Sequence, residues 1–429
     1  MVGITRFSNK PAPPYRFRAP RHVPFFIWLA EHFAPIYLRR MMKVVRIEAS
    51  EEDLAALRKL SGQRVMLTPN HPAQDPAVLF LFGRRLGMNF YWMAARELFE
   101  SPLQGRVFSR VGVYSVDRGR HDQSALSQTR QLLSEGKNWV VIFPEGVNHQ
   151  LYNEVLPFLP GATRVTLEVL DGLSSEMDTP PPVYLLPIAL RYYFLQDMRQ
   201  TALESLARLE RRLGLPSDDS LGLDARLAPI TVQVLELNER HFNVTPRDGD
   251  DEDARLERLK EIALLRVAEG LGIETLNPEL PLRNRVRKLL NLSSQLLESG
   301  HPAGGTYARE LDAARRKRVL QLRHDLSRIS TFMAVRWSYD IETPTVENFM
   351  DVLNLLEMDL LGKMRVWGPR GVQVKVGKPV DVRQYYAEYK AAPAETVERV
   401  TLELENEVRR LLKSTADHMT PIPQAMIFN

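Results

Sequence analysis

Short apolar runs alternate with amphipathic helical patterns from about residue 62 to residue 242. A short apolar run bounded by turn residues predicts a strand, and apolar residues three or four apart predict a helix. Strands are predicted at Val65–Thr68, Phe90–Met93, Val113–Val116, Trp139–Phe143, Tyr184–Leu190 and Ile230–Leu235. Helices are predicted between them at Arg96–Ser109, Gln123–Leu133 and Ala162–Leu170. This alternation is typical of an α/β fold.

The pattern becomes purely helical between residues 254 and 363. Helical periodicity runs through Leu256–Leu271, Arg283–Leu297, Tyr307–Ile329 and Val346–Leu361. Thr343 and Pro344 are the expected cap and first-turn pair of the last of these helices. A strand is then predicted at Val372–Val376 and a final helix at Ala394–Leu412.

We therefore divide the chain into four parts. Residues 1–61 are a basic, aromatic segment, 62–242 an α/β core, 243–363 a helical insertion before the last strand, and 364–429 the closing strands and C-terminal helix. The acidic stretch Asp248–Asp253 is a solvated linker in this division. A separate helical domain is the alternative to an insertion.

The positive charge of the chain is concentrated at its start. Residues 1–46 contain one acid, Glu31, and nine basic residues: Arg6, Lys10, Arg16, Arg18, Arg21, Arg39, Arg40, Lys43 and Arg46. Removing these from the 57 basic and 53 acidic residues leaves 48 and 52, so the net charge of +4 arises in this segment. A basic block of this kind faces anionic lipid, nucleic acid or water.

Aromatic and aliphatic residues between these basic residues favour a lipid surface. The apolar run Phe25–Ala30 is far too short to span a bilayer, which needs about 20 apolar residues. Pro35, within a second apolar stretch at Phe33–Leu38, is expected to interrupt a continuous helix. We expect an amphipathic anchor that lies in the membrane interface and places arginines at anionic headgroups. The alternative is a helix that packs its aromatic side on the domain core.

The amino-acid composition excludes some kinds of catalytic and metal-binding site. Apolar residues make up 44% and charged residues 26% of the 429 residues, as in ordinary globular folds. The sequence has no cysteine, which excludes disulfides, thiolate nucleophiles and thiolate metal ligands. A chain without cysteine suits a reducing cytoplasm. We expect a cytoplasmic, peripheral membrane protein with no metal and no permanently bound cofactor.

The first candidate chemistry follows the first strand of the core. His71 comes directly after Thr68-Pro69-Asn70, at a strand end where α/β proteins usually bind ligands. Asp75 lies four residues on and can reach His71 across one helical turn. A carboxylate there fixes the tautomer of the imidazole and stabilises the imidazolium. Taken alone, such a pair is also a common turn or capping contact.

Two further strand ends carry polar residues. Arg118 follows the strand that Gly112 precedes, and its guanidinium can hold a phosphate by two parallel hydrogen bonds or form a surface ion pair. Glu145 and Gly146 follow another strand, where the carboxylate can orient an arginine or an acceptor and the glycine permits close approach of a substrate. The alternative for Glu145 and Gly146 is an ordinary strand-to-loop turn, and the alternative ion pair of Arg118 would be with Asp117 or a nearby acid.

In combination, these motifs resemble the glycerol-3-phosphate/lysophosphatidate acyltransferase family. The order is Asn70-His71 with Asp75-Pro76, then Gly112 with Arg118, then Phe143-Pro144-Glu145-Gly146, then Leu186-Pro187-Ile188. The stretches Ala95–Phe99, Phe158–Ala162 and Gly377–Val380 are similar to intervening segments of that family. The resemblance covers about residues 62–242 and 366–413, and it implies a central mixed sheet flanked by helices.

The resemblance also implies an activity. It points to an O-acyltransferase of phospholipid biosynthesis that uses acyl-CoA or acyl carrier protein as co-substrate and acylates a glycerol-phosphate or lysophospholipid hydroxyl. His71 would be the general base and Asp75 its partner. Arg118, with Gly112 and the turn at Glu145 and Gly146, would hold the acceptor phosphate. No acyl-enzyme is required, in agreement with the absence of cysteine.

One spacing departs from the family pattern. Four residues usually separate the histidine from the aspartate, and here only Pro72, Ala73 and Gln74 do. Losing one residue rotates a helical position by roughly 100° and shortens it by about 1.5 Å. A helical loop keeps Asp75 over His71, whereas an extended loop moves the carboxylate away from the ring. A catalytically weakened lipid-binding relative on the same fold is therefore the alternative function.

Other functional templates do not occur in the sequence. It contains no Gly-x₄-Gly-Lys-Ser/Thr phosphate loop, no His-Glu-x₂-His zinc helix and no Gly-x-Ser-x-Gly elbow. The basic run Arg315–Arg318 lies among the apolar positions of an amphipathic helix, so it is a solvated side or a second membrane-facing surface. We expect no nucleic-acid partner.

Overall fold

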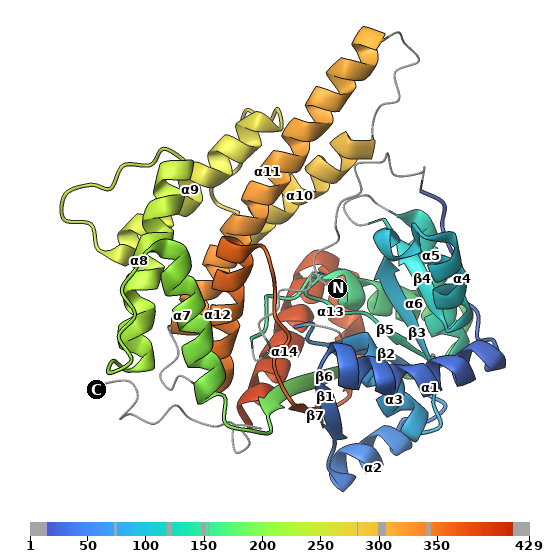
Figure 1. Ribbon diagram of the computed structural model, residues 1–429. Coiled ribbons are helices and arrows are strands. Elements are labelled where there is room, and N and C mark those ends of the chain that lie inside the picture. The colour runs from blue at the N-terminus through green and yellow to red at the C-terminus, as the bar shows by residue number, and fades with distance from the viewer. Residues whose placement is uncertain are drawn as a thin grey trace. The chain divides into compact units, whose positions relative to one another are not determined.

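A computed structural model describes residues 15–72, 75–117, 122–146, 152, 154–280, 282–298, 306–339 and 345–414. These residues form two compact units (Figure 1). Tyr15–Gln196 and Val366–Thr420 form the first, which we call the sheet unit. Asp197–Arg365 belongs to the second, which we call the helical unit.

The sheet unit is built on a central mixed sheet, as the resemblance implied, and this sheet has eight strands. They are β1 (Val44–Glu48), β2 (Arg64–Pro69), β3 (Phe90–Ala95), β4 (Val113–Val116), β5 (Trp139–Val141), β6 (Val183–Phe194), β7 (Arg370–Val376) and β8 (Val380–Asp381). The strand order is β1-β7-β6-β2-β5-β3-β4, and β8 pairs with β6. The sheet is mixed because β6 pairs antiparallel with β7 and β8, whereas the other pairs are parallel.

Helices cover both faces of this sheet (Figure 1). They are α1 (Pro24–Met41), α2 (Glu51–Lys59), α3 (Asp75–Arg85), η1 (Arg96–Phe99), α4 (Pro102–Arg110), α5 (Gln123–Glu135), α6 (Gly161–Glu176), η2 (Val382–Tyr385), α13 (Tyr386–Ala391) and α14 (Pro393–Ser414). Side chains of α1, α2 and α3 pack with Val65 and Leu67 on one face. Those of α5, α6 and α14 pack with Met66 on the other, because successive strand residues point to opposite faces.

Two adjacent central strands form a switch point in this topology. The chain leaves β2 through α3 on one face and reaches β3, on the far side of β5. It leaves β5 through α6 on the opposite face and reaches β6, on the far side of β2. Ligands of open α/β sheets bind in the crevice where neighbouring connections diverge in this way. The topology therefore predicts a ligand site at the carboxyl ends of β2 and β5.

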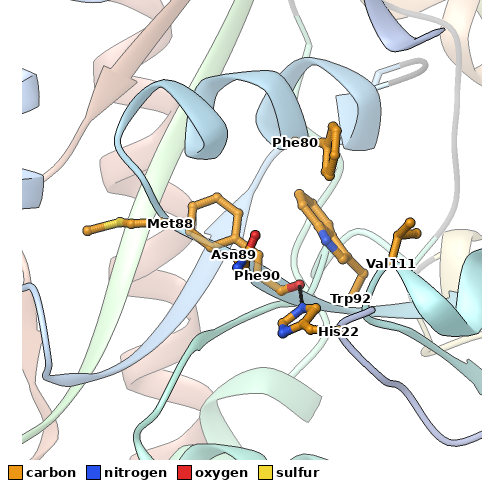
Figure 2. A pocket seen from close by; sticks show the side chains of 7 residues that line it. All are labelled: His22, Phe80, Met88, Asn89, Phe90, Trp92 and Val111. Atoms are coloured by element: carbon orange, nitrogen blue, oxygen red, sulfur yellow. Dashed lines mark hydrogen bonds between the residues drawn. The ribbon is translucent and has the colours of Figure 1, made fainter. Parts of the chain in front are cut away.

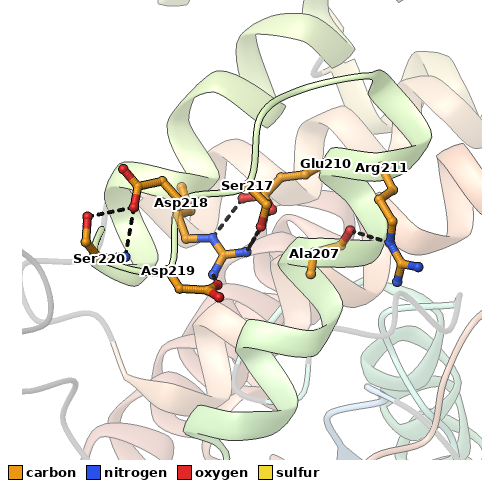
Figure 3. A network of polar contacts seen from close by, with 8 residues as sticks. Ala207, Glu210, Arg211, Ser217, Asp218, Asp219 and Ser220 are labelled. Carbon is orange, nitrogen blue, oxygen red and sulfur yellow. Dashed lines mark hydrogen bonds and ion pairs between the residues drawn. The ribbon is translucent and has the colours of Figure 1, made fainter.

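The helical unit contains α7 (Arg199–Leu213), α8 (Leu223–His241), α9 (Glu252–Gly270), α10 (Leu282–Glu298), α11 (Thr306–Tyr339) and α12 (Val346–Leu361). A buried ion-pair network joins α7 to α8. The guanidinium of Arg226 donates to both carboxylate oxygens of Glu210, at 2.8 and 2.7 Å, and also reaches Ser217 and Asp219 (Figure 3). Arg226 and Glu210 are each only 2% exposed, so removing either side chain would leave the charge of the other unpaired and away from water.

The predicted strand Ile230–Leu235 is wrong, because these residues lie within helix α8. Leu223, Leu227, Ile230 and Val234 are buried at spacings of three and four, which is the helical period, while the β-branched residues around them suggested a strand. The helical unit accordingly begins at Asp197 and includes α7 and α8, rather than beginning at residue 243.

Two expectations about helix ends and interruptions also need correction. Helix α1 continues through Pro35, which was expected to interrupt it. Thr343 and Pro344 lie outside the described residues, and the side chain that caps α12 is that of Thr345, which accepts a hydrogen bond from the Asn348 backbone N–H. The other predicted strands and the four helices of the insertion are present, with ends that differ by up to four residues except in α11, which continues to Tyr339 instead of ending at Ile329. The predicted helix Arg96–Ser109 is divided into η1 and α4.

Candidate active site

The end of β2 is held by a side chain that continues the pairing of the sheet. Asn70 is fully buried, its Nδ2 donates to the Leu190 carbonyl at 3.1 Å, and its Oδ1 accepts from the Leu190 N–H at 2.7 Å. One amide side chain thus satisfies both backbone groups of a residue in β6. This pairing fixes the position at which the chain leaves the sheet and turns into His71.

His71 and Asp75 are in contact, as the helical version of the short spacing predicted. Nδ1 of His71 lies 2.9 Å from Oδ2 of Asp75, which is the first residue of α3. The Asp75 side chain is completely buried, whereas 20% of the His71 side chain is exposed. The imidazole stacks on the Phe143 ring, with 4.2 Å between ring centroids. No described residue hydrogen-bonds to Nε2, so this nitrogen is the one open to a substrate.

Tyr192 of β6 completes the environment of Asp75, and the sequence reasoning missed it. Its hydroxyl donates to Oδ1 of Asp75 at 2.5 Å. Burial, followed by the nearby Asp75 carboxylate, raises the pKa of Tyr192 well above its ordinary value, so the hydroxyl stays protonated and acts as a donor. Tyr192 lies two residues beyond the predicted strand Tyr184–Leu190, because β6 continues to Phe194, and no motif in the sequence singled it out.

Glu145 lies beside His71 but is directed at the backbone. Its Oε1 accepts from the His71 N–H at 2.6 Å and its Oε2 accepts from the Leu156 N–H at 2.7 Å. The residue is only 2% exposed. Glu145 therefore ties the loop after β2 to the chain that follows β5, across the switch point of the topology.

Gly146 adopts a conformation that favours glycine. Its φ is +72°, and a Cβ at this position would lie 2.5 Å from Cδ1 of Leu159. Its N–H donates to the Phe143 carbonyl at 3.1 Å, which closes the turn after β5. The glycine thus allows the tight turn that brings Glu145 under His71.

The structure does not bring Gly112 to His71. Gly112 precedes β4, which runs parallel to its neighbours, so it lies at the amino edge of the sheet, opposite to His71. Its φ is +91°, and a Cβ there would come within 2.3 Å of Nε2 of His22 and 2.7 Å of the Phe90 carbonyl. Packing against the N-terminal segment accounts for this glycine. Arg118 lies outside the described residues.

A small pocket lies elsewhere in the sheet unit and is lined by none of the predicted site residues (Figure 2). Phe80, Met88, Trp92 and Val111 make most of its wall apolar. A ring nitrogen of His22 lies 3.0 Å from the Phe90 carbonyl at its edge. Burial lowers the pKa of His22, so its neutral form is favoured.

Among the described residues, no three His, Asp or Glu side chains are grouped so that they could hold a metal ion. At His71, a carboxylate binds one ring nitrogen, an arrangement that suits proton transfer by the imidazole.

The comparisons with known proteins agree with the sequence motifs. A model of the family described as Acyltransferase matches residues 46–191. A comparison with curated proteins found no match. The matched stretch contains all six predicted site residues and ends one residue before Tyr192.

Proposed function

Because residues 46–191 are a domain of the glycerolipid acyltransferase family and the chain is an acyltransferase, we propose that it acylates a glycerol-phosphate or lysophospholipid hydroxyl, with His71 as general base. The acyl donor in this proposal is the thioester of CoA or of acyl carrier protein. The observation that carries it is the 2.9 Å contact between His71 Nδ1 and Asp75 at the carboxyl end of β2.

The proposed reaction is a direct transfer. Nε2 of His71 takes the proton from the acceptor hydroxyl as the oxygen attacks the thioester carbonyl carbon. Collapse of the tetrahedral intermediate breaks the C–S bond, and the thiolate leaves with the proton returned by the imidazolium. The products are an ester and a free thiol. Asp75, bound to the other ring nitrogen, stabilises the positive charge that the ring carries between these steps.

The acceptor phosphate needs a cation close to His71. We assign this role to Arg118, which follows β4 in the sequence; β4 runs parallel to β3, and its carboxyl end is at the same edge of the sheet as that of β2. A guanidinium binds a phosphate through two parallel hydrogen bonds. Gly146 contributes in this proposal through the tight turn after β5 that places Glu145 beside His71.

Helix α1 supports action at a membrane surface. Among the described residues no helix is long and apolar enough to cross a bilayer. In α1, however, Phe25, Trp28, Phe33 and Ile36 are each more than half exposed, whereas Ile27 and Leu38 are buried. Basic residues Arg39 and Arg40 end the helix. Exposed aromatic side chains next to arginines fit the interface of an anionic membrane, and we place the protein on the cytoplasmic face.

The proposal is tested by acyl transfer from acyl-CoA and acyl carrier protein to glycerol 3-phosphate and to lysophospholipids, with anionic or neutral vesicles present. His71→Ala should lower turnover by about 10²–10⁴-fold, which is the usual contribution of a general base. The control is His241→Ala, which removes a second histidine paired with an aspartate at 2.9 Å. Equal activity of the wild type and His71→Ala would refute the role of His71.

The same assay separates the alternative function. A wild-type protein that binds anionic vesicles but transfers no acyl group to any acceptor would be the catalytically weakened lipid-binding relative. In that case, adding a fourth residue between Pro72 and Asp75 should create activity. In an active enzyme the same insertion should abolish activity, because it rotates Asp75 away from the ring.

A further inference from the structure

Two oxygens of the Asp75 carboxylate are bound to two different side chains. Oδ2 lies against Nδ1 of His71 at 2.9 Å, and Oδ1 accepts a hydrogen bond of 2.5 Å from the Tyr192 hydroxyl. We propose that Tyr192 is a positioning residue for acyl transfer, holding Asp75 so that one oxygen faces His71. This inference rests on the proposed function, because it concerns the orientation of the same general base.

A carboxylate needs such an anchor. The terminal torsion of an aspartate is broad, so a single hydrogen bond to a ring that is itself partly exposed does not fix the plane of the group. His71 is 20% exposed and Asp75 is completely buried. A second hydrogen bond on the opposite oxygen removes the remaining rotation. The catalytic geometry is then set from the buried side of the sheet rather than from the loop that carries His71.

Tyr192 is suited to this role by its place in the sheet. It lies on β6 and is only 3% exposed. Strand β6 pairs with β2 at Val183–Ile188 and with β7 at Ile188–Phe194, where Tyr192 is opposite Val372. Glu145 holds the backbone N–H of His71, and Tyr192 adds a contact from a paired strand to the Asp75 side chain.

Arg370 of β7 stabilises the tyrosine from behind. Cross-strand pairing places Arg370 opposite Phe194 and Val372 opposite Tyr192, so all four residues share one face of the sheet. The Arg370 guanidinium lies 4.0 Å from the centroid of the Tyr152 ring, and Tyr152 meets Tyr192 edge-on at 4.9 Å between centroids.

The charge of Arg370 is itself significant. Arg370 is 3% exposed, and its Nε is buried without a hydrogen-bond partner in the described part of the chain. Its charge acts on Tyr192, where it opposes the rise in the pKa of that tyrosine. The return of the chain to the sheet after the helical unit thus adds a residue that packs, through Tyr152, behind the tyrosine that holds Asp75.

If the Tyr192 hydroxyl had only a structural role, removing it would lower stability and leave the orientation of the His71 ring unchanged. If it positions Asp75, removing it also changes how His71 is held. The matched control is the next residue, Tyr193, whose hydroxyl donates to a different carboxylate, Oε2 of Glu48, at 2.6 Å. Adjacent strand residues point to opposite faces, so Tyr193→Phe removes an equivalent bond away from Asp75.

The experiment compares Tyr192→Phe with Tyr193→Phe in the full-length protein. For Tyr192→Phe we expect kcat to fall by about 10- to 100-fold, which is the cost of a small misplacement of catalytic groups, with KM changed less than about twofold. The acid limb of the pH–rate profile should move to lower pH, because His71 loses part of its carboxylate contact. In protein with ¹⁵N-labelled histidine, the Nδ1–H resonance of His71, assigned with His71→Ala, should move upfield or broaden.

Each outcome decides one question. Kinetics and a His71 resonance equal to those of Tyr193→Phe would overturn the positioning role while leaving the proposed function intact. A wild type without acyl transfer would end the proposed function, yet the His71 resonance would still report on Tyr192. Should Tyr192→Phe fail to fold, 3-fluorotyrosine at position 192 keeps the ring and strengthens the donor. An unshifted His71 resonance in that protein would overturn the proposal.

Discussion

Each of the two units contains a histidine and an aspartate whose side chains lie 2.9 Å apart. In the sheet unit the pair is His71 with Asp75, and in the helical unit it is His241 with Asp325. His241 is 44% exposed and Asp325 20%, compared with 20% and none for the sheet pair. The contact distance is therefore the same, and the two pairs differ in their exposure and in the ring nitrogen that the aspartate binds.

The two aspartates bind different nitrogens of their histidine rings, and this changes what each histidine can do. Asp75 binds Nδ1 of His71, the nitrogen nearer the backbone, and leaves Nε2 at the outer end of the ring for a substrate. Asp325 binds Nε2 of His241, so only the nitrogen beside the backbone remains. In addition, Asp75 has Tyr192 as a second partner and His71 has Glu145 on its backbone. A proton-transfer site needs both an outward nitrogen and a fixed carboxylate.

The largest expected effect comes from breaking the carboxylate side of each pair. Asp75→Asn should lower acyl-transfer turnover by about 10²–10⁴-fold, because an amide can donate to Nδ1 and so hold the imidazole in the wrong tautomer. Asp325→Asn should leave turnover within about twofold. Steady-state kinetics of both variants provide the measurement. Equal losses of turnover in Asp75→Asn and Asp325→Asn would show that the His71 pair has no special part in acyl transfer.

A smaller effect is expected from the backbone anchor that only His71 has. Glu145→Gln replaces one accepting oxygen by an amide nitrogen, which leaves a buried N–H without an acceptor and costs about 1–3 kcal/mol of unfolding free energy. Turnover should also fall, but less than in Asp75→Asn, since the imidazole keeps its carboxylate.

Chemical denaturation and turnover measure the two consequences of Glu145→Gln. The control is Asp53→Asn, because Asp53 is another buried carboxylate of the sheet unit and accepts from the Val376 N–H at 3.0 Å. That variant should lose stability without losing turnover. Loss of turnover in both would mean that the effect of Glu145→Gln is only global destabilisation.

The smallest effect concerns His22 of the sheet unit, whose ring nitrogen lies against the Phe90 carbonyl rather than a carboxylate. Burial lowers its folded-state pKa below the ordinary 6.5, with the Phe90 carbonyl opposing this shift. A depressed folded pKa means that the stabilising contribution is present above pH 6.5 and is lost as the pH falls from there towards the folded-state pKa. The sheet unit should therefore lose stability on acidification through this window.

Denaturation midpoints at pH 7.5 and 5.5 check this expectation. His22→Asn should reduce the difference between the two midpoints by less than the loss seen in Glu145→Gln. His32→Asn, at an exposed position of α1, should leave the difference as in the wild type. An unchanged pH dependence in His22→Asn would show that His22 does not contribute to acid sensitivity.

Much of the sheet unit could be predicted from local pattern. Five of the six strands predicted in the core are present, because short apolar runs bounded by turns leave few other structures. The sixth failed at Ile230–Leu235, where β-branched residues suggested a strand and neighbouring helices instead bury a helical face. Local preference is weak compared with tertiary packing, so such a segment is decided by its neighbours.

The sequence by itself determined that His71 and Asp75 follow a buried strand and lie close enough along the chain to meet. It left open whether they meet, because a helical and an extended loop lead to different distances. Only the tertiary structure decided what fixes that contact. Tyr192 lies 117 residues from Asp75, and Glu145 lies 74 residues from His71. Such partners meet because strands distant in sequence are neighbours in the sheet, and no local spacing encodes that adjacency.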